Sequence, residues 1–214
     1  MRSATSATAQ TGKQGWLKPA WLDRFEQVLI VSLWIFLVWR SVRADNVFAP
    51  LVLIAETTVM VFVLIRRPTD AISVRLGDWF LAVTATAAPL LIWPAATPVA
   101  GLVPPAIALI TLGNCFQIWA KLSLRRSFGI APANRGVKRS GAYRFVRHPM
   151  YAGYLLVHIG IMVLMPSVHN AVLYGIGWTA QVLRLLAEER LLSKDPAYLE
   201  YTGQVRWRLI PGIF

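Results

Sequence analysis

The sequence has few of the residues from which disulfide and metal sites are built. Among its 214 residues there is a single cysteine, Cys115, and there are only three histidines. One cysteine excludes an intrachain disulfide and leaves the redox compartment open. The histidines have no cysteine partner and no metal-ligand spacing, so no metal site is expected. Phosphate loops and dinucleotide fingerprints are also missing, because Gly175 and Gly177 fall inside an apolar segment and not after a strand.

Charged residues are scarce, and acidic ones are scarcer than basic ones. Only 15% of the chain is charged and 56% is hydrophobic, with 22 Lys and Arg against 10 Asp and Glu and a net charge of +12. The basic residues lie between apolar blocks, where they would meet anionic lipid headgroups or fix the topology. No basic helix is interleaved with aromatic residues, so nucleic acid is not an expected partner. Membrane lipids are the expected partner.

Long apolar segments are abundant, and their length is typical of membrane spans. A span needs roughly 20 residues, which makes the first, third and fifth segments short. Residues 1–15 are polar without an apolar core, so they are expected to form a disordered tail and not a secretory signal. We therefore expect an all-α, polytopic integral membrane protein of about six transmembrane helices, with segments at 27–39, 47–65, 79–93, 99–120, 150–165 and 168–187.

The distribution of Lys and Arg predicts the topology. Apart from Arg184, which lies inside the last segment, only Arg40 and Arg43 fall outside four stretches: 1–26, 66–78, 121–149 and 188–214. The positive-inside rule then places both termini and the basic loops in the cytoplasm. The loops on the other side are too short to host chemistry, so a cytoplasmic cofactor pocket is expected. The predicted organisation is an N-terminal tail and interfacial segment at 1–26, four transmembrane helices at 27–120, and a catalytic region at 121–214 with the last two helices and a cytoplasmic tail.

The densest cluster of polar and aromatic residues lies at 140–154. Pro149 lacks an N–H and suits the first turn of a helix, which puts His148 near the N-cap. A helix N-terminus favours a carboxylate, such as the one at the amino-acid end of a cofactor. Gly153 leaves room for a ligand or for another helix. Taken one by one, these residues are also typical of headgroup contacts, interfacial aromatics and packing glycines, but their density favours a site.

A second cluster closes the last apolar segment. Arg184 and Glu188 are four residues apart and share a helix face, and Glu189 follows directly. Ionisable residues at membrane depth are functional candidates, although a helix-end ion pair would also account for them. Beyond them, residues 198–211 are expected to form a short amphipathic helix and a tail that folds back on the loop.

Four polar residues inside the other apolar segments could line a cavity. Asn114, Gln117 and Lys121 are spaced i, i+3, i+7 and fall on one helix face, and Glu56 lies in the second segment. Hydrogen bonds between helices would equally account for Asn114 and Gln117.

These motifs give the sequence a resemblance to the isoprenylcysteine carboxyl methyltransferase family and its bacterial and archaeal relatives, which include phospholipid methyltransferases. The resemblance covers about residues 121–214, and Ala142 departs from it where relatives often have proline. Its motifs are Ser127-Phe128-Gly129, Gly141-x-Tyr143-Arg144-x-x-Arg147-His148-Pro149-x-Tyr151-x-Gly153, Glu188-Glu189-x-x-Leu192, Tyr198-Leu199-Glu200-Tyr201 and Val205 to Pro211.

The resemblance implies an S-adenosylmethionine cofactor at the cytoplasmic ends of the last helices, and a lateral opening that admits a lipid-like or prenylated acceptor. Arg184 or Arg206 would face the acceptor, and Glu188 or Glu189 would be the catalytic carboxylate where a base is needed. The cofactor-binding residues are then expected among Tyr143, Arg147, His148, Pro149, Tyr151, Gly153, Tyr154, Glu188 and Glu189.

The expected activity is methyl transfer, with carboxyl O-methylation favoured. A carboxylate acceptor is ionised at neutral pH and needs no base, and an arginine would orient it. A phospholipid amine would need a base, which leaves N-methylation open. An NADPH-dependent enzyme similar to sterol reductases and a non-catalytic membrane protein are two further hypotheses. The identity of the acceptor and the oligomeric state stay open.

Overall fold

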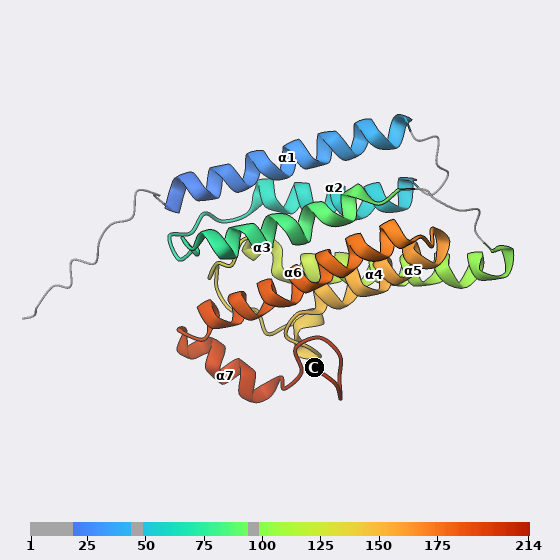
Figure 1. Ribbon diagram of the computed structural model, residues 1–214. Coiled ribbons are helices and arrows are strands. Elements are labelled where there is room, and N and C mark those ends of the chain that lie inside the picture. Colours follow the sequence, from blue (N-terminus) through green and yellow to red (C-terminus); the bar gives the residue numbers. More distant parts are fainter. Residues whose placement is uncertain (1–18, 44–48, 94–98) are drawn as a thin grey trace, which may run out of the picture.

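A computed structural model describes residues 19–43, 49–93 and 99–214 (Figure 1). Within these ranges the chain forms no strand, only one isolated bridge between Ile72 and Ala133, so the all-helical class is confirmed. The helices are α1 (Pro19–Arg43), α2 (Ala49–Ile65), α3 (Leu76–Ala87), α4 (Val103–Leu124), α5 (Pro149–Leu164), α6 (Val168–Leu192) and α7 (Pro196–Gln204), with short 3-10 turns η1 (Ala88–Leu91), η2 (Ala100–Leu102), η3 (Arg125–Ser127) and η4 (Gly141–Arg144).

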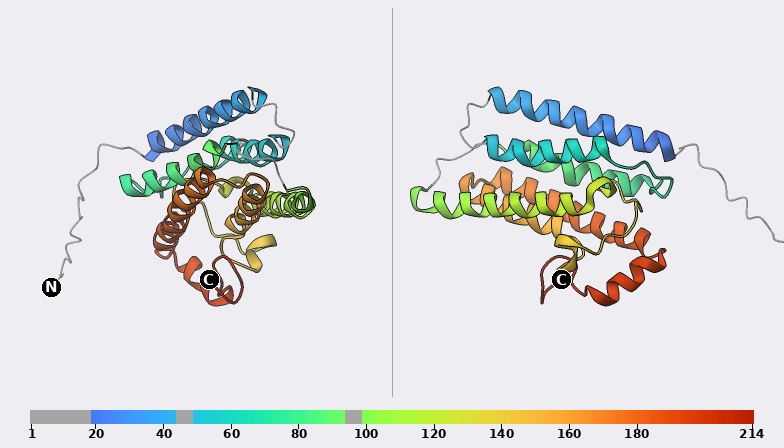
Figure 2. Two further views of the ribbon diagram at one scale, coloured as in Figure 1. Left: turned by 45° about the vertical axis from the view of Figure 1, so that its right-hand side comes forward. Right: turned by 180° about the vertical axis from the view of Figure 1, so that it is seen from behind.

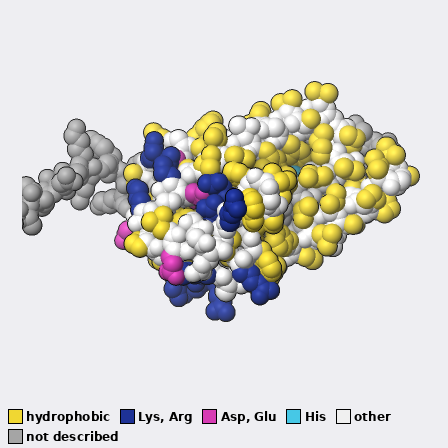
Figure 3. Space-filling model, turned by 90° about the horizontal axis from the view of Figure 1, so that it is seen from below, with side chains coloured by type: hydrophobic (Ala, Val, Ile, Leu, Met, Phe, Trp, Pro, Cys, Tyr) yellow, Lys and Arg dark blue, Asp and Glu magenta, His cyan; other side chains and the backbone are white. Residues whose placement is uncertain are grey.

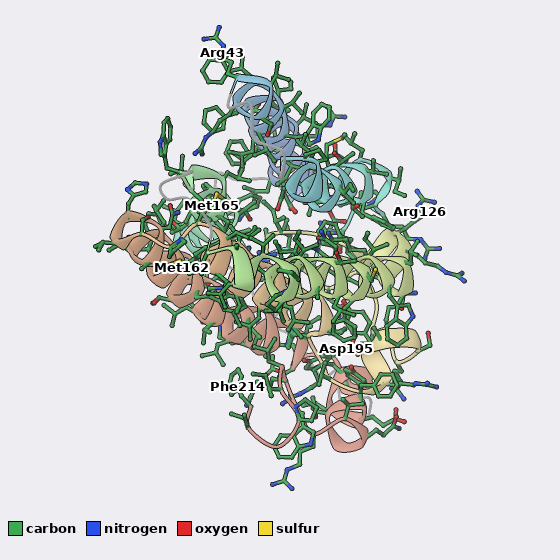
Figure 4. The ribbon with its side chains drawn as sticks, turned by 90° about the vertical axis from the view of Figure 1, so that its right-hand side faces the viewer. Arg43, Arg126, Met162, Met165, Asp195 and Phe214 are labelled. Carbon is green, nitrogen blue, oxygen red and sulfur yellow. The ribbon has the colours of Figure 1, made fainter. Side chains whose placement is uncertain are left out.

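The six long helices run side by side, with α1 on one outer side and α7 with the C-terminal tail on the other (Figures 1 and 2). Figure 4 gives the same arrangement from the side, since Asp195 at the start of α7 and Phe214 lie across the bundle from Arg43 of α1. The start of α1, the connection between α2 and α3, the end of α6 and the whole of α7 gather at one end of the molecule (Figure 1).

The closest helix contact joins α4 to α5, and small residues make it possible. A Cβ atom on Gly153 would lie 2.8 Å from the backbone nitrogen of Gln117, and one on Gly160 would lie 2.7 Å from the carbonyl oxygen of Ala106. Glycines at such positions let two backbones approach, as they do between membrane helices. The contact fixes α5, whose first residues belong to the densest motif of the sequence, against α4.

The first helix is longer than the apolar segment expected at 27–39. It begins at Pro19 and has 25 residues, because its two acidic residues do not interrupt it. Asp23 and Glu26 are buried and form ion pairs with Arg66 at the end of α2. A buried charge is tolerated where it is paired, so flanking residues extend the short apolar segment into a helix of 25 residues. The third segment changes from α-helix to the 3-10 turn η1, which carries Pro89 near its start.

Two stretches of the described chain are long and apolar enough to cross a membrane, Ala20–Arg43 and Ala100–Ser127. A count of six spans therefore stays a prediction, and the loop expected at 94–98 lies outside the described residues.

Charged and hydrophobic side chains are separated on the surface of the molecule. In Figure 3 the Lys, Arg, Asp and Glu side chains gather at the end that carries α7, and the rest of that face is mostly hydrophobic.

Candidate active site

The start of α5 is built as the sequence predicts and is fastened by the tail. His148 is the N-cap residue and Pro149 is the first residue of the helix. The backbone N–H groups of Arg147 and His148 donate to the carbonyl oxygens of Trp207 and Arg208 at 2.9 and 2.8 Å. The expected folding back of the tail onto the loop is therefore confirmed, and the tail closes one side of the site.

Glu189 at the end of α6 is the centre of a buried charged network. Its Oε1 atom lies 2.9 Å from Nη1 of Arg147 and 3.3 Å from Nε2 of His148, and the hydroxyl of Tyr198 donates to it at 3.3 Å. Nε of Arg208 donates to Oε2 at 2.5 Å. Burial raises the pKa of Glu189, but the hydrogen bonds from His148 and Arg208 and the charge of Arg147 outweigh it and lower the pKa to about 2. Glu189 therefore joins α5, α6, α7 and the tail as a carboxylate.

Its neighbour Glu188 has a different environment. Only half-buried, it accepts a hydrogen bond from the hydroxyl of Tyr151 at 2.8 Å. The Tyr151 ring stacks on His148 with 5.5 Å between centroids and 2° between planes. The guanidinium of Arg184, one turn earlier on α6, also lies over the Tyr151 ring, at 5.3 Å from its centroid. Tyr151 thus connects the end of α6 with the start of α5.

The first of two neighbouring cavities, here named the loop cavity, lies at the charged end of the bundle. Glu188 is one of the residues that line this cavity, whereas Glu189 is not. Tyr143, Arg147, His148 and Tyr151, all expected from the sequence, do line it. The other lining residues come from the end of α4, from the loop after it and from α5, α6 and α7: Leu124, Ser127, Gly129, Ala131, Ala133, Arg135, Gly136, Val137, Lys138, Met150, Leu192, Tyr198 and Tyr201.

The second cavity, here named the bundle cavity, lies between α2, α3, α5 and α6. Three of its buried polar atoms find no hydrogen-bond partner in the described part of the chain: the hydroxyl of Tyr174, Nε2 of Gln181 and Nε of Arg184. All three can donate a hydrogen bond. The remaining lining residues are Glu56, Val59, Ala85, Thr86, Pro89, Ile130, Tyr154, His158, Gly177 and Trp178.

The polar face expected on the fourth apolar segment is present on α4. Nζ of Lys121 donates to Oε1 of Gln117 at 2.8 Å, and Nε2 of Gln117 donates to Oδ1 of Asn114 at 2.8 Å. The ammonium of Lys121 also lies 5.4 Å from the ring centroid of Tyr154, which lines the bundle cavity. The polar face of α4 therefore forms hydrogen bonds along its own helix and reaches the edge of the bundle cavity through Lys121.

Besides Glu189, three expected site residues lie outside the two cavity walls. Gly153 faces α4 at the closest helix contact, so its small size serves helix packing. Pro149 is buried at the start of α5. Arg206 is exposed on the tail, where its guanidinium stacks on Trp207 at 4.9 Å from the ring centroid. Arg208, two residues later, is the tail arginine that reaches the charged network.

Several residues of the two cavities were not singled out from the sequence. Arg135 and Lys138 line the loop cavity, and His158 and Tyr174 line the bundle cavity. Tyr154 and His158 follow His148 and Tyr151 at helical spacing on one face of α5, a periodicity that the sequence does contain. No comparable signal distinguishes Arg135 from the other basic residues of its loop.

Comparison with known proteins shows a similarity to two kinds of methyltransferase. Residues 104–195, from the start of α4 to just beyond α6, match the family model described as phospholipid methyltransferase. Over 101 residues, 46% of this chain and 48% of the relative, the sequence is 30% identical to Protein-S-isoprenylcysteine O-methyltransferase A of Arabidopsis thaliana. The chain thus spans about half the length of this curated relative. The resemblance expected from the motifs is confirmed: the part of the chain from α4 to α6 is similar to methyltransferases of the isoprenylcysteine carboxyl methyltransferase and phospholipid methyltransferase type.

Proposed function

We propose that the protein transfers a methyl group from S-adenosylmethionine to a lipid-like or prenylated acceptor, with the cofactor in the loop cavity and the acceptor in the bundle cavity. One observation carries this assignment. The two cavities meet at Tyr151, which lines the loop cavity, and Arg184, which lines the bundle cavity and lies over the Tyr151 ring. A methyl donor on one side and an acceptor on the other would have a common border there.

The residues of the loop cavity suit the parts of S-adenosylmethionine. Nε of Arg147 is buried and finds no partner among the described residues, so a donor is available to the cofactor's carboxylate. Glu188 supplies an acceptor for its hydroxyl or ammonium groups. The rings of His148 and Tyr151 offer a flat surface for its base. Glu189 is already held by three basic groups and is expected to organise the site without touching the cofactor.

The bundle cavity suits an acceptor whose reacting end carries oxygen atoms. The unpartnered donors of Tyr174, Gln181 and Arg184 supply the hydrogen bonds that a carboxylate needs. Aliphatic and aromatic side chains such as Val59 and Trp178 line the same space and would contact an apolar chain. A carboxyl acceptor, and therefore O-methylation, is the activity these features support best.

Methylation of a carboxylate needs no general acid or general base. S-adenosylmethionine supplies an electrophilic methyl group on a sulfonium when it is bound. An acceptor oxygen would form the new bond to the methyl carbon while the carbon–sulfur bond breaks, and the electron pair would stay on sulfur. A carboxylate is already ionised at neutral pH. Arg184 would orient it, and alignment with exclusion of water can contribute roughly 7–11 kcal/mol in favourable cases.

The proposal includes a membrane location with the site at the cytoplasmic surface. Tyr198 and Tyr201 of α7 line the loop cavity, and α7 lies at the charged end of the molecule (Figure 3). By the positive-inside rule such an end would face the cytoplasm. In this arrangement residues 27–120 form the first membrane helices and residues 121–214 form the catalytic region.

N-methylation of a phospholipid amine is the second candidate, because one acidic side chain enters the acceptor space. Glu56 of α2 lines the bundle cavity, and a carboxylate could accept a proton from an amine. The matched family model carries the name of phospholipid methyltransferases. Incubation of membranes with labelled methyl donor and extraction of the lipids distinguishes the two, since a methyl ester is released by mild base and an N-methyl group is not.

Cofactor binding tests the proposal directly. We expect the purified protein in detergent to bind S-adenosylmethionine, and not NADPH, by calorimetry. The His148→Ala variant should bind about tenfold more weakly, because it loses a stacked ring and a partner of Glu189. The matched control is His169→Ala, an exposed histidine at the opposite end of α6. Equal affinity of wild type and His148→Ala would contradict the placement of the cofactor.

A further inference from the structure

A three-residue segment of the loop after α4 forms a wall that the two cavities share. Gly129 and Ala131 line the loop cavity, and Ile130 between them lines the bundle cavity. Ile130 is almost completely buried. The carbonyl oxygen of Gly129 also accepts a hydrogen bond from Nη2 of Arg184 at 3.4 Å. The position of this segment, 129–131, therefore affects both cavities and the arginine at their border.

The segment is held by a side chain of the first helix, about 100 residues earlier in the sequence. Oε1 of Glu26 in α1 accepts hydrogen bonds from the backbone N–H groups of Ile130 at 2.5 Å and Ala131 at 3.4 Å. Glu26 is completely buried and forms an ion pair with Arg66, the residue that follows α2. Hydrogen bonds from backbone N–H groups to a buried carboxylate are among the stronger ones in proteins.

A second carboxylate of α1 holds the neighbouring part of the wall. Oδ1 of Asp23 pairs with Nη2 of Arg135 at 2.9 Å, and Arg135 lines the loop cavity. The Arg135 guanidinium lies directly on the backbone at Gly129, where a Cβ atom would meet Nη1. A larger residue at position 129 would therefore displace the Arg135 side chain. Asp23, Arg135 and Gly129 thus form a continuous chain of contacts from α1 to the shared wall.

We propose that Asp23 and Glu26 are positioning residues, which set the wall between cofactor and acceptor through Arg135 and the N–H groups of Ile130 and Ala131. The inference rests on the proposed function, since it takes the two cavities as the sites of the two substrates. It assigns a role to α1, which lies outside the matched range 104–195. The first helix is then part of the active-site construction, in addition to its place in the membrane.

A purely structural role would make a different prediction. If the α1 carboxylates only joined α1 to α2, their loss would lower the amount of folded protein. The binding stoichiometry and the apparent kcat would then fall, but the protein that remains folded would keep its affinity for the cofactor. The cofactor Kd and the acceptor KM of the folded protein therefore separate positioning from stability.

The test replaces Glu26 and Arg66 together with apolar residues. Asp23, which also pairs with Arg66, keeps its ion pair with Arg135, so no buried charge is left uncompensated. The variant is Glu26→Leu with Arg66→Met. Its matched control is Asp78→Leu with Arg190→Met, which removes the 2.8 Å ion pair between α3 and α6 at the same end of the bundle. Neither Asp78 nor Arg190 is among the lining residues of the two cavities.

We expect the Glu26–Arg66 variant to raise the Kd for S-adenosylmethionine and the acceptor KM by about tenfold, in line with the loss of charged hydrogen bonds. The control should stay within about twofold of wild type. A second variant, Asp23→Asn, keeps the size of the side chain and an acceptor for Arg135, and it should raise the cofactor Kd by about threefold. Because it retains the Glu26 contacts, it tests the proposal even if the double variant does not fold.

The outcomes are distinct. An unchanged cofactor Kd in the Glu26–Arg66 variant and in Asp23→Asn, or equal rises in test and control variants, would overturn the positioning role and leave the proposed function standing. A wild-type protein that does not bind S-adenosylmethionine would overturn both.

Discussion

The two cavities differ in how their charged and polar groups are satisfied. At the border of the loop cavity, the carboxylate of Glu189 already has Arg147, His148 and Arg208 as partners. In the bundle cavity, Arg184 and Tyr174 present buried atoms without a partner among the described residues. Buried polar groups in folded proteins are almost always hydrogen-bonded. The Glu189 carboxylate is thus satisfied within the protein, whereas these donors, like Nε of Arg147 in the loop cavity, are available to the ligands that we propose.

The sharpest way to test this difference is to remove the donor at the border of the two cavities. Arg184→Leu takes away a buried guanidinium that we place against the acceptor's carboxylate. We expect kcat/KM for the acceptor to fall by about 10²–10³-fold, the effect of truncating one partner of a buried charged contact. Initial rates of methyl transfer with limiting acceptor give this ratio.

The control is Arg206→Leu, which removes an arginine of the tail that stacks on Trp207 outside both cavities. It should leave kcat/KM within about twofold of wild type. A large loss in Arg206→Leu, or a normal rate in Arg184→Leu, would reverse the assignment of the acceptor contact.

The two adjacent glutamates allow the same comparison within one turn of α6. Glu189→Gln leaves three basic groups around a neutral amide, so we expect a loss of about 3 kcal/mol in the free energy of unfolding. Glu188→Gln removes a charge for which the hydroxyl of Tyr151 is the hydrogen-bond partner, so its stability should stay near that of wild type. Its cofactor Kd should rise instead, by about fivefold.

Thermal unfolding in detergent and cofactor calorimetry of the two variants measure these effects side by side. If both substitutions lowered stability equally and neither changed the cofactor Kd, Glu188 would be a second structural residue and the division between the glutamates would be wrong.

The sequence predicts a large part of this arrangement where the signal is local. The all-helical class and the start of α5 at Pro149 follow from apolar segments and from proline chemistry. The tyrosines and basic residues around His148 do line a cavity, as their density indicated. Each of these signals depends on residues within one or two turns of each other.

The sequence does not predict which charged residues form ion pairs when they lie far apart along the chain. Asp23 and Glu26 resemble the polar flank of an apolar segment, because Arg66 and Arg135, which pair with them, lie 40 or more residues away. No signal in the neighbouring sequence indicates that Glu189, and not Glu188, forms the ion pair with the tail. From the sequence, Gly153 could leave room either for a ligand or for another helix. Only the position of α4 shows that a helix fills this space.

The pH dependence of stability gives the smallest and most specific test of the Glu189 network. Its carboxyl has a pKa lowered to about 2 from the ordinary value of 4.5, so its ionised form is stabilised by folding. The stabilisation is complete above pH 4.5 and is lost as the pH falls through about 2. Glu189→Gln cannot titrate at this position. The difference in unfolding temperature between wild type and Glu189→Gln should therefore be constant from about pH 7 to pH 5, shrink below that, and disappear near pH 2. A difference that vanishes already at pH 5 would mean that Glu189 is not ion-paired, and the contrast between a satisfied loop network and an unsatisfied bundle cavity would no longer hold.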